Sequence, residues 1–520
     1  MRTLSGQLSR RNFMKVAGTM TGTALLAACA AGQPIPSAST GGAAVADVPE
    51  VYLWPSIALL RPEGSDPTKY EAVQQYLTEQ TGVKPVGFVA PPGAAAQEKL
   101  NLMLGSRDER LDLFTGNWPD YKSIIVPIGD LLEQHGVNIL QAHKETNWAG
   151  MKDTEGNVWG IPRLGLMGHT WNFTWLRTDW LDELGIAFDK EQMGVDDLET
   201  IMTAFKERDP EAVMVTNDLN GLRGALVGGW TDYGYSRWFD ASDGKIKPAE
   251  LQNGFDAWVA KMNEWWNKGW FHQEVFSGMD FEEVLRSGKM GVHAGWYSRI
   301  TILGQRIMLE NVVPGMAFDF PKKLMGPIGL CGTNNASMTS AYMVTQKCPN
   351  PEAVIKYINW MYDPEKDNVV TAHMGIPGTD WEWVDPDNKY YVRRKADMEA
   401  GDEIYAGEFF AAAGLGPETW YAPDDDLWRR HYEHIRDYAT VYENGRMPID
   451  ADVAYDMSII NDRVPGMNDL NRLMSEETIK FITGVRPLTE WGDFIDTLYQ
   501  AGLNDWMDAF TEQYLAVHPV

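Results

Sequence analysis

Short apolar segments alternate with amphipathic ones from residue 49 onwards, and this alternation constrains the fold more than any other feature. Apolar runs at residues 51–54, 84–90 and 111–114 predict β-strands. Between them, apolar side chains recur at helical spacing over residues 70–77 and 100–104, which predicts two helices. Strands that alternate with helices form a parallel sheet, and ligands bind such sheets beyond the carboxyl ends of the strands. We therefore expect an α/β protein with a ligand site near the loop that follows the third strand.

Length and composition limit the classes of function. A chain of 520 residues is too long for one hydrophobic core and predicts two or three lobes. The formal net charge of −28 at pH 7 repels phosphate groups, so we expect no nucleic acid and no direct binding to a lipid surface. The three cysteines are too few for a disulfide framework, and pairing of Cys331 with Cys348 stays open. The 21 Trp and 20 Tyr residues exceed the needs of core packing and direct the search for a site towards aromatic loops.

The N-terminal segment has the pattern of an export signal followed by a tether. Arg10-Arg11 precedes an uncharged stretch at residues 16–28, an arrangement typical of a twin-arginine signal. This stretch is shorter than the ~20 residues that a membrane-spanning helix needs. Small residues directly before Cys29 resemble a lipobox, in which the cysteine thiol is diacylated. The sequence therefore predicts a signal peptide at residues 1–28, lipidation of Cys29, and a flexible tether at residues 29–48.

Several short motifs, taken in order, give the rest of the chain a resemblance to a known family. The most specific is Leu176–Gly185, with the sequence Leu-Arg-Thr-Asp-Trp-Leu-Asp-Glu-Leu-Gly. The others stand at residues 116–120, 129–132, 156–162, 205–210, 287–291 and 491–503. Together they resemble the extracellular solute-binding proteins of carbohydrate ABC importers. Within that superfamily the chain is similar to the large group that includes alginate-oligosaccharide-binding proteins and Gram-positive lipoproteins.

The resemblance implies a periplasmic-binding-protein-like α/β fold. In this fold two α/β lobes are joined by a multi-strand hinge, and the ligand lies in the cleft between them. The resemblance places the first lobe at residues 49–167, with a return at residues 333–376. It places the second lobe at residues 168–332 and 377–520, the latter including the C-terminal helices.

One motif departs from the family in a way that concerns metal binding. Relatives often carry a calcium loop directly after the Asp-Pro pair that matches Asp209-Pro210. Here the pair runs into residues 211–215, Glu-Ala-Val-Met-Val, which lack the alternating oxygen ligands of such a loop. We therefore expect no metal ion at this loop, and no cofactor.

Candidate ligand contacts are aromatic and polar side chains in loops that Gly or Pro flanks, or beside the expected hinge. Sugars present apolar C–H faces, on which aromatic rings stack, and hydroxyl groups, which polar side chains bind. The residues that meet this description are Trp118, Asp120, Arg163, His169, Trp171, Trp230, Asp232, Trp296, Tyr297, Trp381 and Trp383. Core or interlobe packing is the alternative role for these tryptophans, and Arg163 and His169 could instead bind backbone carbonyl groups. Tryptophans on predicted helices, such as Trp180 and Trp258, are expected in the core.

The resemblance implies a receptor at the outer face of the cell membrane. Such a protein is a lipid-anchored monomer that captures an oligosaccharide or related carbohydrate and delivers it to an ABC permease without catalysis. Two alternatives stay open. An exported carbohydrate-active enzyme could hold a catalytic carboxylate pair, although no Gly-x-Ser-x-Gly, His-Glu-x-x-His or P-loop motif occurs. A peptide-binding importer subunit has a similar length, but the characteristic segments of that group are not evident.

Overall fold

Two hydrophobic cores with no buried residue in common organise the protein. The computed structural model describes residues 48–54, 67–88, 91, 94–143, 145–153, 155–163, 172–296, 299–304, 307–308, 310–332, 339–383, 386, 392–394, 412–413 and 448–519. The first core draws its buried residues from 51–161 and 341–413. The second core draws its buried residues from 176–331 and 453–514. Each core therefore combines segments that lie far apart in the sequence.

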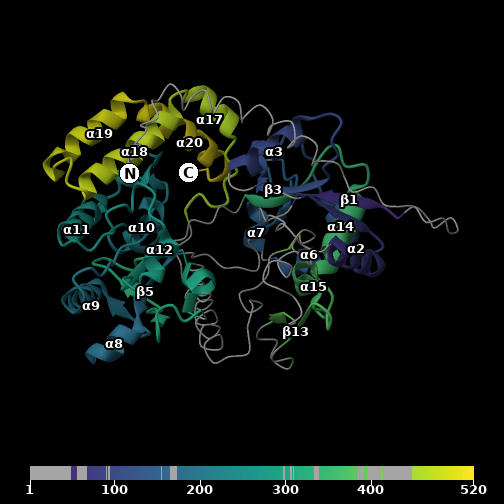
Figure 1. Ribbon diagram of the computed structural model, residues 1–520. Helices are drawn as coiled ribbons and strands as arrows, with labels where there is room; N and C mark the ends of the chain where they lie inside the picture. The colour runs from purple at the N-terminus through teal and green to yellow at the C-terminus, as the bar shows by residue number, and fades with distance from the viewer. Residues whose placement is uncertain are drawn as a thin grey trace, which may run out of the picture. The chain divides into compact units, whose positions relative to one another are not determined.

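A five-stranded sheet with the order β2-β1-β3-β12-β4 supports the first core (Figure 1). Its strands are β1 (Glu50–Leu53), β2 (Lys84–Gly87), β3 (Leu113–Asn117), β4 (Ile161–Pro162) and β12 (Ser340–Val344). β1 runs parallel to β2 and β3, whereas β12 runs antiparallel to β3 and β4. The carboxyl ends of β1 to β4 therefore meet the amino end of β12 at one end of the sheet, which we call the first edge.

Helices cover this sheet, and α14 and α2 lie beside β1 and β2 (Figure 1). The Asn350 side chain caps α14 by accepting a hydrogen bond from the Ala353 N–H, and Pro351 occupies the first turn, where its missing N–H is not needed. The helices of this part are α2 (Pro67–Thr81), α3 (Ala94–Gly105), α4 (Trp118–Tyr121), α5 (Gly129–His135), α6 (Val137–Ala142), α7 (Glu145–Ala149), α14 (Pro351–Met361) and α15 (Asn368–Met374).

A three-stranded antiparallel sheet with the order β10-β5-β9 adjoins the second core. Its strands are β5 (Asn172–Arg177), β9 (Val292–Trp296) and β10 (Phe318–Asp319). Side chains alternate between the faces of a strand, so Leu176 and Val292 enter the second core while Phe173 and Trp175 enter a smaller cluster on the other face. Asn172 at the start of β5 stands opposite Trp296 at the end of β9. We call this end of the sheet the second edge.

The C-terminal helices extend the second core. α18 packs against α11 (Figure 1), and α20 packs against β8. Trp258 on α11 is fully buried, and Trp180 on α8 is also buried, as expected for tryptophans on helices. The helices here are α8 (Thr178–Leu184), α9 (Val195–Arg208), α10 (Leu219–Leu226), α11 (Phe255–Asn267), α12 (Phe281–Arg286), α17 (Met457–Arg463), α18 (Met467–Ile482), α19 (Trp491–Gln500) and α20 (Leu503–Val517).

Short elements complete the described part of the chain. The two-stranded pairs are β6 (Met193–Gly194) with β11 (Leu324–Met325), β7 (Trp238–Asp240) with β8 (Lys245–Lys247), and β13 (Trp381–Trp383) with β14 (Val392–Arg394). Single turns are the 3₁₀-helices η1 (Val227–Gly229), η2 (Ala249–Leu251) and η6 (Leu488–Glu490) and the π-helix η3 (Arg299–Gly304).

Trp381, Ala412 and Ala413 contact elements beside or within the first core, whereas the sequence predicts residues 377–520 in the second lobe. The Trp381 indole N–H donates to the Gly375 carbonyl oxygen at 2.9 Å. Ala412 and Ala413 belong to the first core, and the Ala413 carbonyl oxygen lies 2.7 Å from His373 Nε2. Residues 381, 412 and 413 therefore lie close to α15 and to Gly375, which directly follows it.

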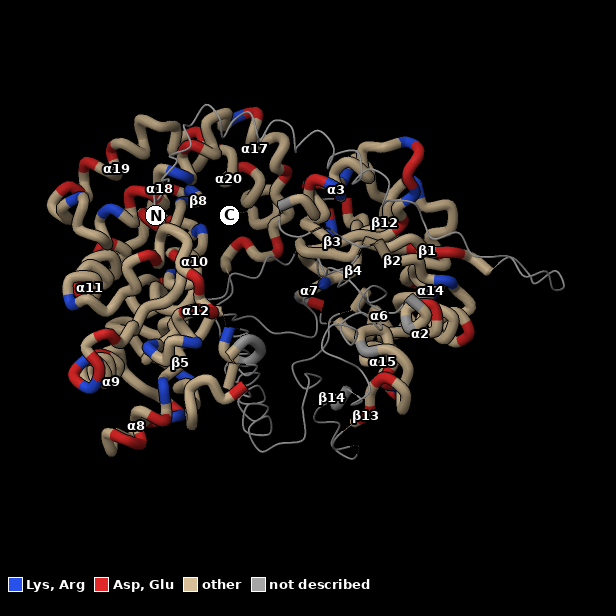
Figure 2. Tube along the Cα trace, viewed as in Figure 1, with Lys and Arg blue, Asp and Glu red and all other residues tan. Residues whose placement is uncertain are grey.

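Acidic residues outnumber basic ones, and the two cysteines among the described residues form no disulfide. Asp and Glu total 73 against 45 Lys and Arg, and acidic positions lie on elements around both cores (Figure 2). Cys331 and Cys348 are free thiols. Burial raises the pKa of Cys348 to about 12, so this thiol is protonated at neutral pH.

No helix in the described ranges is long and apolar enough to cross a membrane.

Candidate functional site

Three predicted site residues, Trp118, Asp120 and Arg163, lie at the first edge. β3 ends at Asn117, and Trp118 directly follows as the first residue of α4. The Trp118 backbone N–H donates to the Thr339 carbonyl oxygen at 3.1 Å, and the Arg163 N–H donates to the Ser340 carbonyl oxygen at 3.0 Å. These bonds join the ends of β3 and β4 to the start of β12. The first edge therefore corresponds to the place where ligands bind parallel sheets.

The Trp118 ring is enclosed by the protein. Its side chain is 2% exposed, and its indole N–H donates to the Gly150 carbonyl oxygen at 2.8 Å. The ring stacks on half-buried Trp159, with centroids 6.0 Å apart and planes 9° apart. Burial and a satisfied N–H indicate a packing role, and ligand contact by this ring stays a prediction.

Trp159 belongs to a hydrogen-bonded network around Asp153. One carboxylate oxygen of Asp153 accepts from the Trp159 indole at 2.8 Å and from the Lys122 ammonium at 3.0 Å. Burial alone would raise the pKa of Asp153, but hydrogen bonds from Trp159, Asn157 and Lys122 hold it well below its ordinary value. The polar groups around Trp159 are thus hydrogen-bonded to one another.

Asp120 on α4 is half-buried beside a second carboxylate. Burial raises the pKa of Asp120, the charge of Asp456 adds to this effect, and a hydrogen bond from Asn117 opposes it. Asp456 is the N-cap of α17, and α17 packs against α4. The surroundings of Asp120 at the first edge therefore favour its protonated form relative to an exposed aspartate.

The second edge presents an exposed aromatic ring beside side-chain amides. Trp296 is 51% exposed, and Asn172 directly opposite it is half-buried. Helix α10 lies against this pair at Gly224, where an added Cβ would stand 2.3 Å from Asn172 Nδ2. A Cβ at Gly221 would stand 1.7 Å from Asn217 Nδ2. The two glycines permit an approach of the amides that a Cβ atom would block. This approach comes at a cost, because glycine within a helix is about 1 kcal/mol less favourable than alanine.

The other face of the same strands carries an apolar and basic cluster. His293 is buried, its Nδ1 lies 2.9 Å from Thr216 Oγ1, and Phe281 meets its ring edge-on at 4.9 Å. Burial lowers the pKa of His293 to about 3, so the imidazole is neutral at physiological pH. The Arg299 guanidinium stands 5.9 Å from the Phe281 ring centroid. Because residues 293 and 296 point to opposite faces of β9, Arg299 belongs with the face away from Trp296.

Trp230 and Asp232 lie in a loop after η1. Trp230 is buried in the second core, and its carbonyl oxygen would stand 2.0 Å from a Cβ on Gly254. Asp232 is exposed, and its neighbour Tyr233 stacks on Trp238 at 5.8 Å. The exposed members of this loop are thus Asp232 and Tyr233, while Trp230 packs inside.

Trp381 and Trp383 form a perpendicular pair on β13, with ring centroids 5.7 Å apart. Trp381 is buried, and the Trp383 indole N–H donates to Asp367 Oδ2 at 2.9 Å. Both indole N–H groups therefore have partners within the same part of the chain. The remaining predicted residues His169, Trp171, Tyr297 and Cys29 lie outside the described residues.

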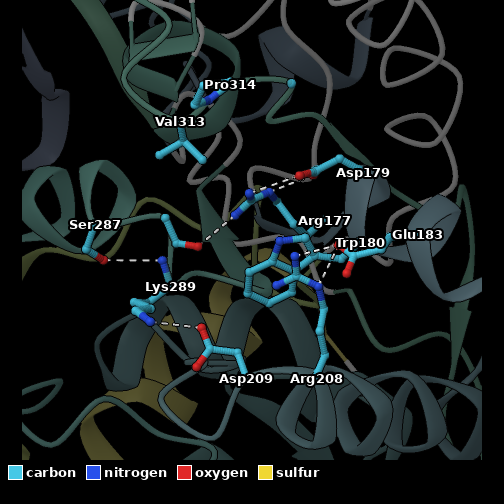
Figure 3. A pocket seen from close by; sticks show the side chains of 12 residues that line it. Arg177, Asp179, Trp180, Glu183, Arg208, Asp209, Ser287, Lys289, Val313 and Pro314 are labelled. Atoms are coloured by element: carbon cyan, nitrogen blue, oxygen red, sulfur yellow. Dashed lines mark hydrogen bonds and ion pairs between the residues drawn. The ribbon is translucent and has the colours of Figure 1, made fainter.

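A cavity of about 430 Å³ lies at the opposite end of β5 (Figure 3). Arg177 pairs with Asp179 at 2.6 Å, and Arg208 pairs with Glu183 at 2.5 Å. The two guanidinium groups lie 4.6 and 4.5 Å from the Trp180 ring centroid. These charges are paired with one another, and the length of β5 separates the cavity from Asn172 by about 16 Å at ~3.3 Å per residue. The cavity is therefore an ion-pair cluster separate from both edges.

Lys289, which also lines this cavity, bridges the two carboxylates at the position of the absent calcium loop. Its ammonium lies 3.0 Å from Asp209 Oδ2 and 3.1 Å from Glu211 Oε2. Within the described ranges, no group of three or more His, Cys, Asp or Glu side chains has the arrangement of a metal site. The positive charge at this loop is supplied by a side chain.

Residues 62–367 match the family described as bacterial extracellular solute-binding protein. The chain belongs to this family. Members bind solutes outside the cytoplasm, so the protein is an exported solute-binding protein. No curated protein sequence matches the chain significantly.

Solved structures of solute-binding proteins share the fold over nearly their whole length. The alginate-binding protein AlgQ2 without calcium ion matches with 20% identity and a TM-score of 0.60, covering 89% of this chain and 97% of that one. FusA of S. pneumoniae, in complex with kestose, matches with 19% identity and a TM-score of 0.59, covering 89% and 98%. An extracellular solute-binding protein of Bifidobacterium longum subsp. infantis matches with 16% identity and a TM-score of 0.64, covering 91% and 100%. The periplasmic-binding-protein-like α/β fold predicted from the motifs is confirmed.

Three residues near the two edges of this solute-binding protein were not predicted as site residues from the sequence. Trp159 lies within a family motif but gave no sign that it stacks on Trp118. Asn172 and Asn217 are ordinary polar residues in the sequence. The signal that could have drawn attention to them is the Gly-x-x-Gly spacing of Gly221 and Gly224 inside a helix, since two helical glycines on one face indicate close packing.

Proposed function

We propose that this solute-binding protein is the carbohydrate-binding subunit of an ABC importer. The observation that carries the proposal is the family match together with a fold shared with binding proteins whose names specify carbohydrates: alginate, kestose and, in a third case, an N-glycan transport protein of Streptococcus pneumoniae. The exposed Trp296 ring and nearby amides supply the contacts that sugars require: apolar stacking and hydroxyl binding.

The proposed mechanism is capture between two lobes. We place the first lobe at residues 49–167 and 333–413 and the second at residues 168–332 and 448–520. The bond from Trp381 to Gly375 and the contact of Ala413 with His373 support this division. A ligand that contacts both lobes stabilises a closed state relative to an open one, and the closed state docks on the permease. The protein acts as a monomer and performs no chemistry on the ligand.

Export and anchoring follow from the N-terminal sequence. We propose that Arg10-Arg11 directs the chain to the twin-arginine route and that Cys29 is diacylated at the outer face of the membrane. Two acyl chains suffice for stable anchoring, whereas one is marginal. Replacement Cys29→Ser should move the protein from the membrane fraction to the soluble fraction. Unchanged membrane association of that variant would contradict lipidation at Cys29.

The test of the function is a thermal-shift panel of neutral oligosaccharides, acidic oligosaccharides and oligopeptides. A ligand that binds the folded state raises the melting temperature according to its concentration relative to Kd. We expect stabilisation by at least one carbohydrate and by no peptide. Stabilisation by peptides alone would support a peptide importer. Products that accumulate during incubation with the stabilising carbohydrate would identify an enzyme.

A further inference from the structure

We propose that the ammonium groups of Lys206 and Lys289 take the place of a calcium ion at the turn of residues 209–213 and keep divalent cations out of it. Related proteins often carry a calcium loop at this place. The inference goes beyond the proposed carbohydrate function, because it concerns the response of the protein to calcium and holds for any solute. The contacts of the two lysines with the turn carry it.

Three oxygen atoms of the turn are each bound by a lysine ammonium. Lys289 Nζ lies 3.0 Å from Asp209 Oδ2 (Figure 3) and 3.1 Å from Glu211 Oε2. Lys206 Nζ donates to the Ala212 carbonyl oxygen at 2.9 Å. Carboxylates and backbone carbonyl groups are the oxygen ligands that calcium loops supply. The two lysines therefore contact the classes of donor atom that a calcium ion would use.

The two lysines reach the turn from separate segments and line a common cavity. Lys206 lies in the last turn of α9, whereas Lys289 stands just before β9. Both line a cavity of about 560 Å³, together with Glu211 and Ala212 of the turn. The Val213 N–H donates to the Lys289 carbonyl oxygen at 2.8 Å, so the backbone itself holds Lys289 beside the turn. The fold therefore places both charges next to the same oxygen atoms.

The charges at the turn balance one another. Burial alone would raise the pKa of Asp209, but the hydrogen bond from Lys289 helps to hold it below its ordinary value, so Asp209 is ionised at neutral pH. Burial lowers the pKa of Lys206, and the charge of Asp209 opposes this shift, so the same carboxylate also acts on the second ammonium. Two ammonium groups carry the total charge of one calcium ion, and both would repel a divalent cation that entered the turn.

The remaining atoms of the segment do not fit a calcium ion. Calcium takes about six to eight oxygen ligands, whereas Ala212, Met214 and Val215 are apolar residues buried in the second core. The Glu211 N–H donates to Asp209 Oδ1 at 2.9 Å, so this oxygen is also in use. The segment therefore lacks the ligand set of a calcium loop and holds two cations of the protein in its place.

Calorimetric titration of the full chain with calcium chloride tests the inference. We expect no saturable binding to the parent up to about 10 mM calcium. The double variant Lys206→Met with Lys289→Met frees the three oxygen atoms and should bind calcium at least tenfold more tightly than the parent. Its Kd should lie near about 1 mM, the weak end of the range for protein calcium sites, with water completing the ligands. Its melting temperature should rise by about 2 °C or more in 10 mM calcium.

The matched control removes a comparable ion pair elsewhere. Lys322 Nζ lies 2.7 Å from exposed Glu191 Oε1, and Lys322→Met should leave the response to calcium at the level of the parent. Lys289→Met alone frees both carboxylates and should show part of the gain, so the test does not depend on the double variant. Melting temperatures of the calcium-free variants within about 3 °C of the parent show that they are folded, as expected for partly exposed pairs.

Two results would overturn the inference. Saturable calcium binding by the parent would show that the lysines do not exclude the ion. Equal calcium affinity of the parent and of both lysine variants would show that the two ammonium groups do not occupy the place of a cation. Neither result bears on the carbohydrate function, which the thermal-shift panel tests separately.

Discussion

The two edges use tryptophan in opposite ways. At the first edge Trp118 is buried, stacked on Trp159 and hydrogen-bonded to Gly150, so its ring is enclosed by the protein. At the second edge Trp296 is half exposed next to an amide. A tryptophan at a strand end in this α/β protein is enclosed in one case and exposed in the other, so its position at a strand end does not by itself determine its exposure.

Removal of the two rings should give the largest difference between the edges. Trp118→Ala should destabilise the protein by about 3–5 kcal/mol, because it leaves a cavity beside Trp159. Trp296→Ala should change the free energy of unfolding by less than about 0.5 kcal/mol, because the position is exposed. Urea unfolding of both variants measures the difference. Equal losses would show that the second edge is also structural.

The next prediction concerns α10, the helix that packs against β5 and β9. Arg223 on α10 is fully buried, and its Nη2 lies 3.0 Å from Glu250 Oε1, while Nη1 donates to the Tyr235 hydroxyl at 2.6 Å. Arg223→Ala should cost about 3–5 kcal/mol because it leaves the Glu250 carboxylate buried and unpaired.

The matched control for Arg223 is the double variant Arg223→Met with Glu250→Gln. Removing both charges should recover a large part of the loss, since no unpaired charge remains. The same unfolding experiment measures it. A double variant as unstable as Arg223→Ala would show that the loss comes from packing and not from the charge.

A smaller effect, dependent on pH, belongs to the first edge. The folded state holds the pKa of Asp153 below the ordinary value of about 3.9, so Asp153 stabilises the protein above that value and this contribution is lost as pH falls further. Asp153→Asn should cost about 1–3 kcal/mol at pH 7 and flatten the loss of stability below pH 4. Unfolding curves between pH 7 and pH 2.5 test this. Parallel pH profiles for parent and variant would contradict the role of Asp153.

The smallest effect is expected away from both edges, where Lys289 bridges Asp209 and Glu211. Calcium or a chelator should shift the melting temperature by less than about 1 °C, since the loop already contains its cation. Lys289→Met should leave the melting temperature nearly unchanged, because both ion pairs are partly exposed. A rise in melting temperature with calcium would refute the prediction of a metal-independent loop.

Sequence reasoning succeeded where the information was local or repeated in order. Apolar runs predicted β1 and β3 within a few residues, and the ordered motifs led to the correct family and fold. It could not tell Trp118 from Trp296, because the burial of Trp118 depends on Gly150 and Trp159, which stand 32 and 41 positions further along the chain.

Asn172 shows the same limit of prediction from the sequence. Asn172 acquires meaning only through its register opposite Trp296 and through Gly224 on a helix about 50 residues away. It is equally hard to predict from the sequence which part of the fold a segment joins. The contacts of Trp381 with Gly375 and of Ala413 with His373 are an example. Contacts between distant segments leave little trace in local pattern.

The exposure of Trp296 also gives the protein an optical property. Among the tryptophans whose side chains the structure describes, it is the one that counts as exposed; the others are buried or half-buried. Iodide in solution quenches indole emission by collision and so reaches this ring before the enclosed ones. Emission from Trp296 therefore provides an intrinsic signal, and its protection from iodide on addition of a molecule would show that the molecule covers this ring.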